Sequence, residues 1–117
     1  MRLLQANGLM EWRIGPDGSA WGSNAASDAD QDMAMALLMG CKKFGDSNMC
    51  LEGESLIRRL MLFEVENATD ALKPGDTWGG CAAKSPVFNP SYFAPASYRR
   101  VLVLTRTCPR TWKVRKV

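Results

Sequence analysis

The chain has 117 residues, enough for one domain with a modest core. Its hydrophobic fraction of 46% and charged fraction of 23% are close to the averages of soluble globular proteins, which excludes a disordered or fibrous class. The chain contains no histidine, which excludes Ser-His-Asp and Cys-His catalysis and argues against a Cys/His zinc site. Any chemistry must therefore come from carboxylates.

Charge is distributed unevenly along the chain. Residues 1–98 contain all twelve acidic residues and eight Lys/Arg, whereas residues 99–117 contain seven Lys/Arg and no acid. We predict a folded part at residues 1–98 and a basic tail at residues 99–117, and we hypothesise that the tail is read out of frame or is otherwise non-native. A nucleic-acid-binding arm is the alternative, but no interleaved motif supports it, and we expect no nucleic-acid partner.

The cysteines and the amino-terminal residues bear on the cellular compartment of the chain. Cys41, Cys50, Cys81 and Cys108 include no C-x-x-C pair, and we expect free thiols. The first residues lack the apolar core of a signal peptide, and no stretch approaches the ~18 apolar residues of a membrane span. As it stands, the chain is expected to be soluble and cytoplasmic, without a membrane partner.

The pattern predicts a helix from Ser27 to the Gly45-Asp46 pair, after a short helix near residues 9–12 and an irregular loop at residues 13–26. The Ser27 hydroxyl and Asp30 are spaced as in a capping box at its first turn. Apolar side chains occupy nearly every face of this helix, which predicts burial on most sides.

A second, amphipathic helix is predicted from about Met49 to Asn67, with a long loop after it. Its apolar stripe consists of Leu56, Ile57, Leu60, Met61 and Phe63. A third helix is expected to begin near Ser91 or Pro95 and to run through Tyr98 towards Leu104. The fold class predicted is all-α, with long loops between helices.

Three segments resemble one known family in the same order. Ala26–Leu38 resembles the signature of glycoside hydrolase family 8, and Phe44 falls on the aromatic position that closes it. Leu72–Asp76 with Trp78–Gly80, and Asn89–Ala96, resemble two later motifs of that family. Three ordered matches are more specific than one.

The resemblance implies that the chain is an internal fragment of an (α/α)6 barrel of the six-hairpin glycosidase kind. The helix from Ser27 would then belong to the inner ring and the helix from Met49 to the outer ring. Because a partial barrel exposes the apolar faces that its neighbours would cover, we expect poor stability in isolation and self-association through those faces.

The function implied by the resemblance is that of an inverting endo-β-1,4-glucanase, a cellulase acting on β-1,4-linked polysaccharides without a cofactor. Inversion requires a carboxylic acid and a carboxylate about 6.5–9.5 Å apart. In the family, the acid lies upstream and the base downstream of the three matching motifs, so we expect this chain to be inactive alone. The alternative is a non-catalytic helical module that binds carbohydrate or a protein.

The acidic start of the first helix contains the candidate site residues. The resemblance implies that Asp28 binds and distorts the sugar at the cleavage point, with Asp30 as a second acidic site position. The plainer interpretation is a charged helix start, since acidic residues suit the positive end of a helix dipole. A calcium loop is rejected because Met33 and Met39 stand where its glycine and glutamate belong, and no metal site is predicted.

Aromatic residues in or beside the two long loops complete the candidate site. Flat rings can stack on pyranose rings, although each ring is equally compatible with a place in the core. The substrate-binding candidates are Trp12, Trp21, Trp78 and Tyr92.

Overall fold

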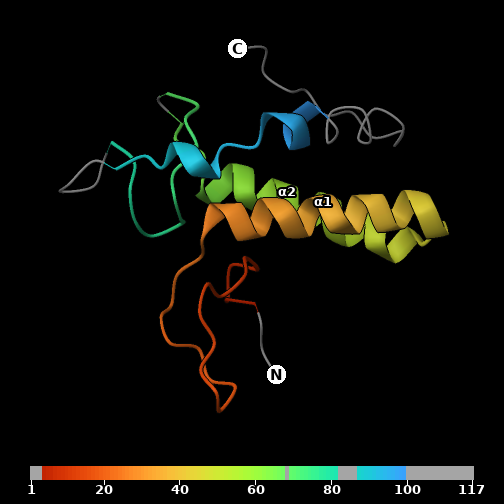
Figure 1. The fold of residues 1–117 in the computed structure, drawn as a ribbon, viewed down its shortest axis with the longest axis horizontal. Helices are drawn as coiled ribbons and strands as arrows, with labels where there is room; N and C mark the ends of the chain where they lie inside the picture. Colours follow the sequence, from red (N-terminus) through yellow and green to blue (C-terminus); the bar gives the residue numbers. More distant parts are fainter. Residues whose placement is uncertain (1–3, 68, 82–86, 100–117) are drawn as a thin grey trace.

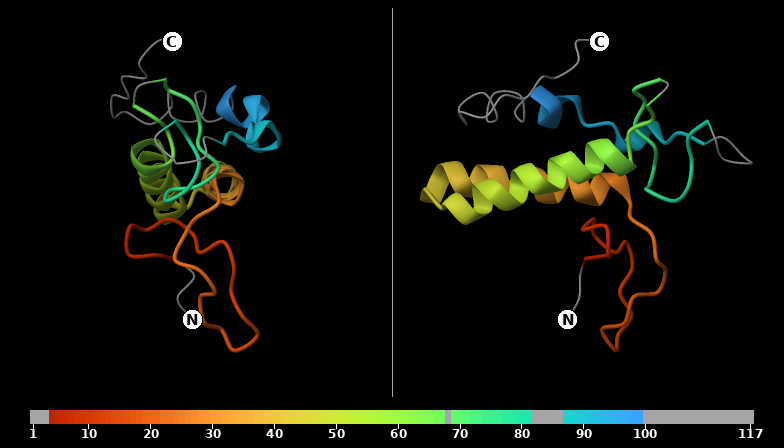
Figure 2. Two further views of the ribbon diagram at one scale, coloured as in Figure 1. Left: turned by 90° about the vertical axis from the view of Figure 1, so that its left-hand side faces the viewer. Right: turned by 180° about the vertical axis from the view of Figure 1, so that it is seen from behind.

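A computed structural model of the chain describes residues 4–67, 69–81 and 87–99. Its main elements are α1 (Ser27–Phe44) and α2 (Ser47–Phe63), which lie side by side as an antiparallel hairpin (Figures 1 and 2). A 3₁₀ turn, η1 (Pro90–Tyr92), and helical residues 95–99 follow. Pairing within the described ranges is limited to isolated β-bridges, without a strand, which confirms the all-α prediction.

The first turn of α1 begins at the predicted residue but is not capped as predicted. The N-cap residue is Ala26, the buried Ser27 hydroxyl has no hydrogen-bond partner among the described residues, and Asp30 accepts a hydrogen bond from Met10 instead. The Ser27 backbone N–H donates to the carbonyl oxygen of Pro74 at 3.0 Å. A loop distant in sequence thus satisfies a free amide that local capping was expected to satisfy.

The connection between the helices is only two residues long. Gly45 ends α1 with a left-handed φ of 68°, a conformation that glycine adopts without steric penalty, and its N–H donates to the Cys41 carbonyl oxygen at 2.8 Å. Asp46 then caps α2, because its side chain accepts from the backbone N–H groups of Asn48 and Met49. The second helix therefore runs from Ser47 to Phe63, whereas the predicted helix runs from about Met49 to Asn67.

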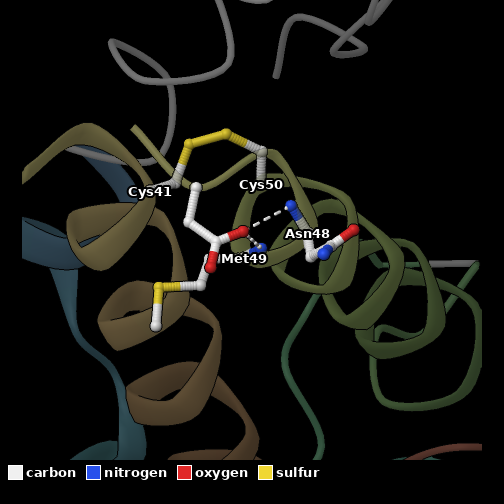
Figure 3. The surroundings of a disulfide bond; sticks show 5 residues. Cys41, Asn48, Met49 and Cys50 are labelled. Carbon is white, nitrogen blue, oxygen red and sulfur yellow. Dashed lines mark hydrogen bonds between the residues drawn. A yellow bond between two sulfur atoms is a disulfide. The ribbon is translucent and has the colours of Figure 1, made fainter. Parts of the chain in front are cut away.

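A disulfide joins Cys41 in the last turn of α1 to Cys50 in the first turn of α2 (Figure 3). Their Cα atoms are 5.1 Å apart, within the range that a disulfide spans. The prediction of free thiols is wrong for this pair, because the tight reversal brings together two cysteines whose spacing suggested no pairing. Cys81 is a free, exposed thiol, and Cys108 lies outside the described residues.

The core lies between the hairpin and the segments that approach the start of α1. Gly53 lets the helices approach closely, since a Cβ there would lie 3.1 Å from Leu38 side-chain atoms. The core cluster consists of Leu9, Ala25, Ala34 and Leu56, with Leu37 and Ile57 packed against it, and Leu38 and Leu60 are also buried.

One face of α1 is not covered by any described segment. Met33, Met39 and Phe44 are 37%, 47% and 69% exposed, so the prediction that this helix is buried on most sides is wrong for this chain. Met61 and Phe63 of the predicted α2 stripe are likewise exposed. The described part of the chain leaves these side chains without neighbours that bury them. It also contains no helix long and apolar enough to span a membrane.

The segments outside the hairpin are mostly irregular. Residues 9–12 form no helix, because Leu4 and Met10 instead make an antiparallel bridge, and a second bridge joins Ile14 to Ala20. Helical structure resumes at Pro95, one of the two predicted starts, while its extension towards Leu104 falls outside the described residues. So does the basic tail beyond residue 99.

Candidate functional site

Three segments converge on the first turn of α1 (Figure 1). The N-terminal segment contacts it where the Met10 N–H donates to Asp30 Oδ1 at 2.8 Å. The segment after α2 contacts it through the Ser27–Pro74 hydrogen bond, and η1 contacts it through Gln31, whose Nε2 donates to the Tyr92 carbonyl oxygen at 3.0 Å. The three sequence motifs therefore meet at one end of one helix.

Asp28 lies in this first turn of α1. Its side chain is half-buried, and its Oδ1 accepts the Ala29 backbone N–H at 2.9 Å. The other oxygen, Oδ2, has no hydrogen-bond partner among the described residues. Asp28 is therefore the acidic residue of this turn that a ligand can reach while its carboxylate remains oriented by the helix.

Asp30 differs from Asp28 in being fully buried. Burial raises the pKa of its carboxyl to about 6, and the nearby charges of Asp76 and Asp28 act in the same direction. Hydrogen bonds from Met10 and Glu64 oppose that rise. The structure thus gives Asp30 an internal contact with the N-terminal segment and no open face for a ligand.

Glu64, the residue that ends α2, is a buried carboxyl that the sequence interpretation missed. It is 0% exposed, and burial raises its pKa to about 9, with the negative charges of Asp30 and Asp76 adding to the effect and Lys73 opposing it. Its position was detectable, because Leu56, Leu60 and Glu64 share one helical face, on which a glutamate continuing a buried stripe is unusual.

Asp76 ties two of the converging segments together. Its Oδ1 accepts the backbone N–H groups of Ala25 at 2.8 Å and Thr77 at 2.9 Å, and its Oδ2 accepts from Asn7 Nδ2 at 2.8 Å. The Lys73 ammonium group donates to the Asp76 carbonyl oxygen at 3.1 Å. This residue lies in the second matching motif, but its bracing role was not predicted.

The four aromatic candidates fall into two groups. Trp78 and Tyr92 lie beside the first turn of α1, since Trp78 Nε1 donates to the Ala25 carbonyl oxygen at 3.3 Å and Tyr92 is held by Gln31. Trp12 and Trp21 belong to a hairpin-like loop, whose stem is joined by the Trp12 N–H to Asn24 carbonyl bond.

Arg13 links the second aromatic group. Its guanidinium lies 4.7 Å from the ring centroid of Trp21 and 5.8 Å from that of Trp12, a cation–π arrangement. The two rings remain 53% and 49% exposed, respectively. The three tryptophan rings are therefore exposed, whereas Tyr92 is half-buried. Within the described ranges, no group of three or more Cys, Asp or Glu side chains is arranged to hold a metal ion.

Solved structures with a similar fold define the class of protein. An endoglucanase of glycosyl hydrolase family 8 from Klebsiella pneumoniae superimposes with a TM-score of 0.73 at 28% identity, over 89% of this chain and 37% of that one. A family 8 endo-β-1,4-glucanase from an Achatina fulica gut metagenomic library gives 0.75 at 26% identity, over 89% and 34%. The hairpin and its loops are therefore part of an (α/α)6 barrel.

Sequence comparison identifies the family. The family model "Glycosyl hydrolases family 8" matches residues 2–115. Endoglucanase 2 of Ruminiclostridium josui is 48% identical over 102 residues, and Endoglucanase A of Acetivibrio thermocellus is 45% identical over 103 residues. The chain belongs to glycosyl hydrolase family 8. It spans about one fifth of each of these two relatives, as each match covers 82% of this chain and 21% of the relative.

Proposed function

We propose that this chain is a segment of the catalytic domain of an inverting endo-β-1,4-glucanase, in which it forms part of the β-glucan-binding cleft. The observation that carries the proposal is the convergence of three segments on the first turn of α1, where Asp28 presents a half-buried carboxylate and Trp78 is held at Ala25, just before that turn. An oriented carboxylate with an adjacent flat aromatic surface suits a sugar ring, which offers hydroxyl donors at its rim and an apolar face.

In this proposal, the acidic residues of the first turn have different roles. Asp28 contacts the sugar at the cleavage point. Asp30, which is buried and bonded to Met10, acts by holding the N-terminal segment in place. Trp12 and Trp21 extend the aromatic surface along the polysaccharide. The general acid and base are supplied by parts of the domain outside the three matching motifs, so that the chain alone binds glucan without cleaving it.

The Cys41–Cys50 disulfide supports an extracellular location for the protein that carries this segment, since structural disulfides persist in oxidising compartments. This proposal replaces the cytoplasmic expectation drawn from the amino-terminal residues.

A chimaera tests the role of Asp28. The 103 matching residues of Endoglucanase A from Acetivibrio thermocellus are replaced by this chain, and release of reducing sugar from carboxymethylcellulose is measured. We expect an active chimaera, in which Asp28→Asn lowers kcat by about 100-fold or more, as loss of one transition-state contact does. Asp32→Asn, on an exposed residue of the same helix, is the matched control and should retain activity.

The isolated chain provides the second arm of the test. We expect no reducing sugar from the chain alone. Measurable turnover by the chain alone would contradict the proposed division of roles, and full activity of the Asp28→Asn chimaera would remove Asp28 from the site. Binding of cello-oligosaccharides that does not depend on Asp28 or the loop aromatics would favour a non-catalytic binding module.

A further inference from the structure

Two carboxyl groups from different helices are buried together beneath the candidate site. Asp30 of the first turn of α1 and Glu64 at the end of α2 are both 0% exposed. Asp30 Oδ1 accepts the Met10 N–H, but Asp30 Oδ2 and both Glu64 oxygens have no other donor among the described residues. Three buried carboxylate oxygens without a donor would be strongly destabilising.

One proton on Glu64 would supply the hydrogen-bond donor that Asp30 Oδ2 lacks. Both side chains are fully buried and act on each other electrostatically, and a carboxylate can accept a hydrogen bond from a carboxylic acid but not from another carboxylate. The charged groups that act on Glu64 are Asp28 and Asp30 of α1 and Asp76 and Lys73 of the following segment, so three negative charges oppose one positive charge. Ionising both carboxyls together is therefore disfavoured until the pH approaches the raised pKa of Glu64, about 9.

The pair also joins two of the three segments that form the site. Asp30 lies two residues after Asp28 and binds the N-terminal segment two residues before Trp12. The Glu64 carbonyl oxygen accepts the Lys73 backbone N–H at 2.7 Å, which anchors the segment leading to Trp78. A contact between the two side chains therefore fixes the relative positions of the candidate sugar-binding residues.

We propose that Glu64 is a positioning residue, which in its neutral form donates a hydrogen bond to Asp30 Oδ2 and so holds the first turn of α1 and the N-terminal segment in register. Its effect on sugar binding rests on the proposed function, whereas the hydrogen-bonded carboxyl pair does not.

The test begins with the unsubstituted 117-residue chain, isotope-labelled for NMR. The side-chain carboxyl resonance of Glu64 is followed as a function of pH. We expect its titration midpoint near the raised pKa of about 9. A midpoint near the ordinary glutamate value of about 4.3 would overturn the proposal. This measurement does not depend on the folding of any variant.

Two substitutions then separate the loss of the ionisable group from the loss of the hydrogen-bond donor. Glu64→Gln keeps a neutral donor of the same shape, so the Met10 amide should exchange with solvent as slowly as in the parent chain. Glu64→Ala removes the donor and should accelerate that exchange by about tenfold or more, unless it unfolds the chain. Equal acceleration in both variants would overturn the proposal. Glu52→Gln, on an exposed residue of α2, is the control.

Cellohexaose binding provides a separate readout. Glu64→Gln should keep the Kd of the parent chain, and Glu64→Ala should weaken it. If the parent chain binds no cellohexaose, the proposed function fails, while the Glu64 titration still decides the carboxyl pair. If Glu64→Gln keeps the slow exchange of the Met10 amide but binds cellohexaose more weakly, the positioning role is contradicted.

Discussion

Asp76 Oδ1 accepts the backbone N–H of Ala25 at 2.8 Å, which joins the loop after α2 to the residue that precedes the N-cap of α1. The same carboxylate accepts from Thr77 and from the Asn7 side chain. One side chain thus holds two of the converging segments together around the candidate site, and its removal leaves several donors unsatisfied.

We expect Asp76→Ala to lower the free energy of unfolding by about 3 kcal/mol or more, since hydrogen bonds to charged groups contribute about 1.5–3 kcal/mol each. Asp76→Asn should be less severe, because its single carbonyl oxygen still accepts. Urea unfolding followed by circular dichroism measures both. Asp32→Ala serves as the control and should change stability by less than about 0.5 kcal/mol. Equal stability of Asp76→Ala and Asp32→Ala would show that the bracing is unimportant.

The disulfide is expected to stabilise the hairpin at the end away from the candidate site (Figure 3). Replacing both Cys41 and Cys50 with alanine should lower the free energy of unfolding by about 2–3 kcal/mol, the loop-closure contribution of a bridge between residues nine apart. A dithiothreitol-treated parent chain should match the double variant in urea unfolding. Cys81→Ala, at an exposed free thiol, should match the untreated parent. An unchanged midpoint on reduction would contradict the prediction.

Trp78 is expected to contribute to polysaccharide binding through its partly exposed ring. Trp78→Ala should raise the Kd for cellohexaose about tenfold, the effect of losing an aromatic anchor of about 1.4 kcal/mol. Isothermal titration calorimetry measures the change, and Trp78→Phe, which keeps a flat ring, should lose less. Phe44→Ala removes an aromatic ring that is 69% exposed at the far end of α1. If that control weakens binding as strongly, the aromatic surface at the first turn is not the binding surface.

Stability should fall as the pH rises. In the folded chain, the pKa of Asp30 is raised to about 6 and that of Glu64 to about 9, above their ordinary values near 3.9 and 4.3. At pH values between the ordinary and the raised pKa of each group, the folded chain keeps a proton that the unfolded chain has released. A rise in pH over this range therefore favours unfolding. The Tm should be lower at about pH 8 than at about pH 5.

Thermal unfolding of Glu64→Gln tests the origin of this dependence. The variant cannot ionise at residue 64, so its Tm should change less over the same range, while Glu52→Gln should follow the parent chain. A Tm that rises with pH in the parent chain would be inconsistent with the two raised pKa values.

Local sequence patterns predicted the bounds of the helices better than they predicted which residues contact those helices. The start of α1 at Ser27 and its end at Gly45 follow from residues next to them in sequence, because a helix ends where a left-handed residue stops its hydrogen-bond ladder. The first-turn capping box failed because Met10 and Pro74, both distant in sequence, took over the hydrogen bonds. Local spacing contains no information on such partners.

In the candidate site, too, some residues were found from sequence motifs and others only from the structure. Asp28, Trp78 and Tyr92 were found from motifs that resemble a family, and the family membership is confirmed. Their assignment to a sugar-binding surface stays a prediction. Glu64 was missed although it continues the buried face of Leu56 and Leu60, because its burial beside other acidic residues depends on the tertiary structure.

By itself, the sequence determined the family, the two helices, the loops between them and the absence of histidine chemistry, since these depend on residue identity and short-range order. Only the tertiary structure decided that Asp30 is buried while Asp28 is half-exposed, that Cys41 pairs with Cys50, and that Asp30 and Glu64 meet. These features depend on which side chains exclude water from one another across the hairpin, and burial is a property of neighbours in space.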